Sequence, residues 1–90
     1  MLQIQILGPS CGKCMRLEAM TIEALEASGL ANAHVEKVTD QRIIDRYLIE
    51  DPPGLVINNK VYWAGGDLPA LEQLETWLRS AMAGAYDAHQ

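Results

Sequence analysis

Two cysteines, Cys11 and Cys14, are the residues of this chain that could perform thiol chemistry together, because only two positions separate them. They follow an apolar run, Leu2 to Leu7, and precede a long segment with helical periodicity. Both sulfurs are therefore expected at the start of a helix, where unpaired backbone N–H groups and the helix dipole stabilise a thiolate. A C-x-x-C motif at such a strand-to-helix junction indicates redox chemistry more strongly than the same motif elsewhere.

The composition limits what this pair can belong to. Ninety residues give one domain, and a content of 49% hydrophobic and 21% charged residues is ordinary for a globular protein. Two cysteines are too few for a disulfide framework. The net charge of −5 argues against a nucleic-acid partner. No segment has the roughly 20 apolar residues of a membrane helix, and the N-terminus lacks the pattern of a signal peptide. We therefore expect a cytoplasmic protein without a membrane partner.

The elements that hold the motif follow from hydrophobic periodicity and turn residues. Strands are expected at Leu2–Leu7, Ala33–Val38, Leu55–Ile57 and Val61–Trp63, and helices from Gly12 to Ser28, after Asp40, and with Pro69 in the first turn of the last helix. The apolar sides of the three helices are expected to be Leu17, Met20, Ala24 and Leu25; Ile43, Ile44, Tyr47 and Leu48; and Leu71, Leu74, Leu78 and Met82. Residues 84–90 show no pattern and are expected to form a disordered tail, which leaves residues 1–83 as the domain.

The order of these elements predicts an α/β fold, β-α-β-α-β-β-α. The long helix between the first two strands favours a right-handed parallel crossover. Asn58-Asn59-Lys60 joins the last two strands as a hairpin, because asparagine tolerates positive φ. One mixed four-stranded sheet flanked by three helices follows.

With these elements in place, the chain resembles the small archaeal and bacterial thioredoxin-like proteins, also called redox-active disulfide or glutaredoxin-like proteins. The resemblance covers about Leu2 to Met82 and rests on Cys11-Gly12-Lys13-Cys14, on Pro53 before the third strand and on the Gly65-Gly66 pair. It implies a thioredoxin-like fold and a thiol–disulfide oxidoreductase, specifically a protein-disulfide reductase.

The resemblance also implies roles for individual residues. Cys11 matches the exposed nucleophile, Cys14 the inward-facing resolving cysteine, and Pro53 the proline that the fold holds in the cis form. Ser10, Gly12, Lys13 and Pro53 would support the site, and Pro52, Gly65 and Gly66 would dock the substrate. No cofactor is expected beyond a redox-active Cys11–Cys14 disulfide. The partners would be a disulfide-containing protein or small molecule, and a reductase or thiol donor.

Three features depart from the pattern of the larger thioredoxins. Ser10 stands where they place a tryptophan, and Leu2 to Leu7 contains no acid to deprotonate Cys14. Pro52 precedes the expected cis-proline and has no N–H to offer an extended substrate. In the expected reaction, the Cys11 thiolate attacks a disulfide and Cys14 resolves the mixed disulfide. The helix N-terminus would stabilise that thiolate more than exposed Lys13 does, and Ser10 could donate a hydrogen bond to it.

Two other interpretations of the C-x-x-C motif remain at this point. A purely structural disulfide would close a very short loop and gain little stability. A zinc site needs four ligands, and the chain offers only His34 and His89 besides the cysteines, neither with metal-ligand spacing. A metal shared between two copies, or a redox-sensing binding module, is the alternative to an enzyme.

Overall fold

The computed structural model describes residues 2–8, 12–30, 32–49 and 52–83. Ser10, Cys11, His89 and the expected tail at 84–90 lie outside the described residues. The elements are β1 Leu2–Leu7, α1 Gly12–Ala27, β2 Ala33–Val38, α2 Gln41–Arg46, β3 Gly54–Ile57, β4 Lys60–Ala64 and α3 Leu71–Ala83. This order is the one that the sequence predicted.

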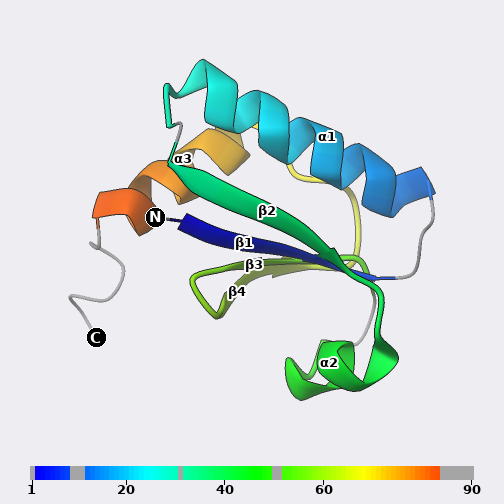
Figure 1. Cartoon of the computed structure of the whole chain (residues 1–90). Coiled ribbons are helices and arrows are strands. Elements are labelled where there is room, and N and C mark those ends of the chain that lie inside the picture. The colour runs from blue at the N-terminus through cyan, green and yellow to red at the C-terminus, as the bar shows by residue number, and fades with distance from the viewer. Residues whose placement is uncertain (1, 9–11, 31, 50–51, 84–90) are drawn as a thin grey trace.

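The four strands form one mixed sheet in the order β2-β1-β3-β4. The β1 and β2 strands are parallel, and β3 runs antiparallel to both β1 and β4. Figure 1 shows α1 and α3 together over one face of the sheet, with α2 on the opposite side. The predicted α/β architecture with three flanking helices is therefore confirmed.

Side chains that alternate along the strands build a core on each face of the sheet. From β1, Leu2, Ile4 and Ile6 pack with α1 and α3 into the larger core, which also takes Leu55 and Ile57 of β3. Leu7 points to the other face, where it packs with Val38, Ile44 and Val56 under α2. The short helix thus covers the end of the sheet at which β1 finishes and β3 begins.

The hairpin between β3 and β4 forms as predicted, with one irregularity. Asn58 and Asn59 have φ of 50° and 68°, as a two-residue hairpin turn requires. Leu55 pairs with Trp63 and Val56 with Val61, so Tyr62 is an extra residue in β4. This bulge lets both Tyr62 and Trp63 pack against the larger core. Tyr62 meets Trp77 of α3 edge to face, with ring centroids 6.2 Å apart.

Two residues expected on apolar helix faces lie at the surface instead. Leu48 is 87% exposed, because α2 ends at Arg46 and the chain turns through a left-handed Leu48, with φ of 56°. Ile49 packs against the smaller core in its place. Met82 is 39% exposed, since the buried side of α3 continues from Leu78 to Ala81. No helix in the described part of the chain is long and apolar enough to cross a membrane.

Candidate active site

Cys14 lies on the buried side of the first turn of α1. It begins the buried stripe of this helix, which continues with Leu17, Thr21, Ala24 and Leu25. The side chain of Cys14 is only 2% exposed, as expected for a cysteine that faces inward. Gly12 and Lys13, the two residues before it, are exposed. The C-x-x-C segment therefore ends with one sulfur inside the protein.

Gly8 packs directly against the sulfur of Cys14. Its N–H extends the parallel pairing beyond β1 by donating to the carbonyl oxygen of Val38 over 2.9 Å. A Cβ atom on Gly8 would lie 2.8 Å from Cys14 Sγ and 3.3 Å from Cβ of Pro52. Its φ of +150° also favours glycine. In the sequence, the place of Gly8 between the first strand and the first cysteine is a signal that could have indicated this close contact.

Pro53 lies beside Gly8, on the same side as the Cys14 sulfur. Its Cα would be 3.4 Å from a Cβ on Gly8, and its side chain is fully buried, whereas Pro52 is exposed. The Pro52–Pro53 bond is cis, so the geometry implied by the resemblance is confirmed. Antiparallel pairing of Leu7 with Gly54 explains the placement, because the start of β3 then meets the end of β1.

The turn of Gly65 and Gly66 completes the arrangement. Gly54 pairs with Ala64, which brings the end of β4 beside the start of β3. The Gly65 N–H then donates to the carbonyl oxygen of Pro53 over 3.0 Å. From the other side, Lys13 Nζ donates to the carbonyl oxygen of Gly66 over 2.8 Å. The structure thus brings the described candidate residues Gly12, Lys13, Cys14, Pro52, Pro53, Gly65 and Gly66 together.

Two shallow hollows adjoin this arrangement. One lies at the start of α1 and is lined by Gly12, Lys13, Arg16, Asp67 and Leu68. The other lies beyond the glycine turn and is lined by Tyr47, Leu48, Ile49, Val61, Ala64, Gly65 and Gly66. The residues that line the first hollow include the charged Lys13, Arg16 and Asp67, whereas none of those that line the second is charged.

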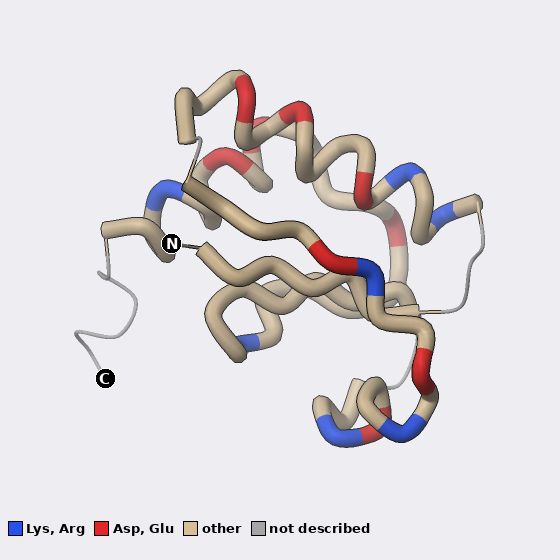
Figure 2. The backbone as a smooth tube through the Cα atoms, viewed as in Figure 1, with Lys and Arg blue, Asp and Glu red and all other residues tan. Residues whose placement is uncertain are grey.

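The charges of α1 are distributed unevenly along the helix. Figure 2 shows basic residues at the beginning of α1 and acidic residues along the rest of it. The first turn has no acid and the last turn has no basic residue. This order is the reverse of the one that stabilises a helix through its dipole. A negative group at the beginning of α1 would therefore be favoured by Lys13, Arg16 and the helix terminus together.

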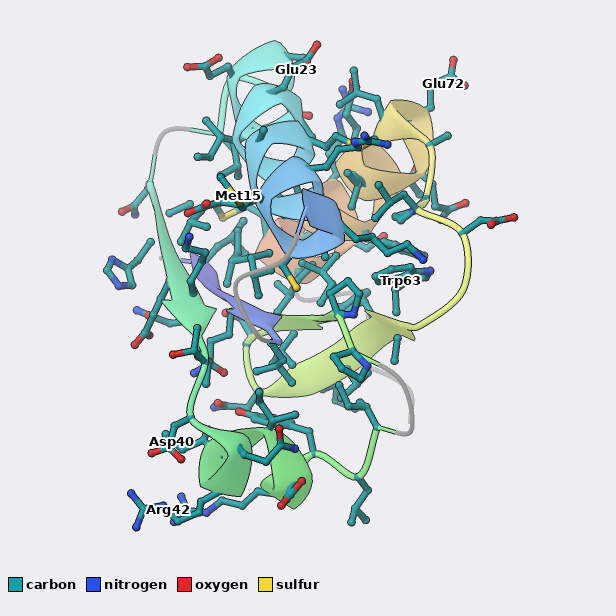
Figure 3. All side chains as sticks on the ribbon, turned by 90° about the vertical axis from the view of Figure 1, so that its right-hand side faces the viewer. Met15, Glu23, Asp40, Arg42, Trp63 and Glu72 are labelled. Atoms are coloured by element: carbon teal, nitrogen blue, oxygen red, sulfur yellow. The ribbon has the colours of Figure 1, made fainter. Side chains whose placement is uncertain are left out.

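The pKa of the Asp40 carboxyl is lowered by contacts that do not involve Cys14. Hydrogen bonds from the Arg42 side chain, and then from the Arg42 backbone N–H, lower the pKa of its carboxyl. The carboxylate is the N-cap of α2, where it accepts from Arg42 N over 2.9 Å. Figure 3 shows Asp40 and Arg42 beside α2, well below α1. His34 is exposed on β2, and no three potential metal ligands gather within the described ranges.

Known proteins share this fold. The family model described as a thioredoxin domain matches residues 2–79. A solved structure of the germline-specific thioredoxin Deadhead from Drosophila melanogaster is similar to 91% of this chain and 78% of its own chain. The two share 22% sequence identity with a TM-score of 0.54, so the likeness concerns the fold. No curated protein matches the chain.

Proposed function

Because this chain belongs to the thioredoxin-domain family, we propose that it is a thiol–disulfide oxidoreductase that acts through Cys11 and Cys14. The observation that carries the proposal is the position of Cys14. Its sulfur is buried in the first turn of α1, against Gly8 and beside the Pro52–Pro53 bond. A buried cysteine is well placed to be the second sulfur to react, because it would attack only after Cys11 has formed a bond with the partner.

The proposed reaction has two exchange steps. The Cys11 thiolate attacks one sulfur of a partner disulfide, whose other sulfur leaves as a thiolate and takes up a proton. Cys14 then gives up its proton and attacks the Cys11 sulfur, which releases the partner's second thiol and forms the Cys11–Cys14 disulfide. The partner gains the two electrons that the cysteine pair loses. A reductase or thiol donor returns them in the same two steps reversed.

The charge distribution of α1 supports a thiolate at its start. Lys13 in the first turn and Glu26 in the last turn oppose the preference of the helix dipole, whereas α3 follows that preference with Glu72 in its first turn. These charges make α1 less stable, and we explain this cost by a need for the N-terminus of the helix to favour the Cys11 thiolate. Only the thiolate form of a cysteine is a nucleophile, so this arrangement would speed the first step.

The partners would be a disulfide-containing protein or small molecule and a reductase or thiol donor. Pro52, Gly65 and Gly66 would form the edge on which the substrate docks, and Ser10, Gly12, Lys13 and Pro53 would support the reacting sulfurs. A reducing compartment such as the cytoplasm fits this cycle, because disulfides there are mostly transient. The cycle needs no cofactor other than the cysteine pair.

A redox titration of the metal-free protein tests the proposal, with Cys11 and Cys14 scored by alkylation and mass. We expect a reversible two-electron midpoint between about −180 and −290 mV, the range of working oxidoreductases. We also expect Cys11→Ser to abolish turnover of a protein disulfide such as insulin, with dithiothreitol as donor. The Cys14→Ser variant should instead accumulate a mixed disulfide through Cys11.

Two results would contradict the proposal. A midpoint far below about −300 mV would mark a structural bond. A cysteine pair that forms no intramolecular disulfide, in protein purified with stoichiometric zinc, would identify a metal-binding module. In that case Cys11→Ser would change the metal content rather than a rate.

A further inference from the structure

Lys13 connects two parts of the site that are distant in the sequence. Its side chain starts in the first turn of α1 and reaches the turn between β4 and α3, where Nζ donates to the Gly66 carbonyl oxygen over 2.8 Å. The two residues are 53 positions apart. This contact gives Lys13 a possible role besides its electrostatic effect on Cys11.

The turn that Lys13 reaches has a backbone with unusual freedom. Gly65 and Gly66 have φ of 71° and 76°, and two glycines in succession can leave this conformation at little cost. The Gly65 N–H is bound to Pro53 O, which fixes one side of the turn to the start of β3. Lys13 binds the next residue along the chain and fixes the same turn to α1. The ammonium thus supplies the link between the turn and the C-x-x-C helix.

We propose that Lys13 is a positioning residue that holds the Gly65–Gly66 turn at a fixed distance from the first turn of α1. The inference rests on the proposed function, because the position of the turn affects exchange only if a substrate docks there. A charge-assisted hydrogen bond is stronger than a neutral one, although solvent weakens it at this exposed site. The hydrogen bond should affect substrate binding, because it holds the docking turn, whereas the charge of Lys13 would act on the reacting sulfur.

Three variants separate the hydrogen bond from the charge. Lys13→Met removes both, and Lys13→Arg keeps the charge and the donors. Arg16→Met is the matched control, because Arg16 lies one turn further along α1, beside the same hollow, and makes no hydrogen bond to the turn in the described part of the chain. Amide relaxation measured by NMR should report increased motion of Gly65 and Gly66 in Lys13→Met. We expect the turn to stay ordered in Lys13→Arg and in Arg16→Met.

Steady-state kinetics with insulin as the disulfide then give the functional readout. We expect Lys13→Met to raise KM by about two- to tenfold over that of Arg16→Met, the effect of one hydrogen bond, whereas the loss of one positive charge near the start of α1 should change kcat by a similar factor in both variants. Lys13→Arg should restore most of the KM. Equal increases of KM in Lys13→Met and Arg16→Met would overturn the inference, because they would assign the effect to charge alone.

The NMR result separates this inference from the proposed function. A wild-type protein that reduces no disulfide would defeat the proposed function, whatever the turn does. Unchanged motion of Gly65 and Gly66 in Lys13→Met would defeat the positioning role alone, even in an active enzyme.

Discussion

The sulfur of Cys14 lies 2.8 Å from the point that a Cβ atom on Gly8 would occupy. The end of β1 and the start of α1 therefore touch through this sulfur, with no space for an additional carbon. Real Cβ contacts are longer than this distance, so a side chain on Gly8 must displace either Cys14 or the adjacent Pro52 and Pro53. One glycine thereby determines how deeply the second cysteine can enter the protein.

We expect Gly8→Ala to lower the free energy of unfolding by about 1–3 kcal/mol, through overpacking and through a φ of +150° that alanine avoids. Urea denaturation measures this loss. The displaced sulfur should also react faster with iodoacetamide in the Cys11→Ser background, where Cys14 is the remaining thiol.

Gly29→Ala is the control for this prediction, because Gly29 has a φ of +69° and, among the described residues apart from its chain neighbours, no atom lies within 4 Å of a built Cβ. Its free energy of unfolding should fall by about 1 kcal/mol, the conformational cost of alanine at positive φ. The reactivity of Cys14 should stay unchanged. If the reactivity of Cys14 rises equally in both variants, the contact with Gly8 is not what confines the sulfur.

Pro52→Thr should favour protein substrates. Pro52 is exposed beside the site and has no N–H, so a threonine there adds a donor for the backbone of an extended polypeptide. One such hydrogen bond contributes about 0.5–1.5 kcal/mol, which corresponds to a several-fold lower KM for insulin. A small disulfide such as hydroxyethyl disulfide has no polypeptide backbone to bind this donor. Equal effects on both substrates would rule out backbone docking at this position.

Leu48→Asn should stabilise the protein. Leu48 is 87% exposed with φ of 56°, so the protein gains little from its burial and carries the cost of a left-handed leucine. Asparagine tolerates this conformation better, and we expect an increase of about 0.5–1 kcal/mol in the free energy of unfolding. Ile49→Asn is the contrasting variant, because Ile49 packs against the smaller core and its replacement should destabilise. A loss of stability in Leu48→Asn would mean that the leucine side chain contributes more than its exposure suggests.

Asp40 gives a pH dependence with a defined sign. Its pKa is lowered from 3.8 by the side-chain and backbone hydrogen bonds from Arg42. The ionised carboxyl therefore stabilises the folded state above pH 3.8, and this contribution disappears as the pH falls through the lower folded pKa. Asp40→Asn keeps an oxygen that can cap α2 but does not titrate.

Thermal unfolding of both proteins over a series of pH values tests this prediction. The advantage of the wild type over Asp40→Asn should be constant near neutral pH and decline in acid. An advantage that grows as the pH falls would contradict the assigned direction of the shift.

The strands could be predicted because local patterns and turn residues mark them, and the bounds Leu2–Leu7 and Ala33–Val38 are confirmed to the residue. The inward position of Cys14 was implied by the family resemblance, and the structure places Cys14 on the same buried side of α1 as Leu17. Leu48 fits the period of α2 as well as Ile44 does. Its exposure follows from where that helix ends, which the period alone does not reveal.

The contacts of Gly8 and Lys13 depend on relationships that no local pattern contains. Gly8 meets Pro53 because Leu7 pairs with Gly54, and that register is set by the whole sheet. Lys13 meets Gly66 only after β4 has placed the glycine turn beside the start of α1. Such contacts join segments far apart in the chain, so they become visible only when the strands are in place.

The burial of Cys14 also bears on how the protein would withstand peroxide. A thiolate open to solvent is oxidised in steps to sulfenic, sulfinic and sulfonic acids, and the last two are generally not reversed. A sulfur that is 2% exposed is protected from the oxidant in bulk water. In the proposed cycle it would condense with a sulfenic acid formed on Cys11 and return that cysteine to a reducible disulfide before irreversible damage.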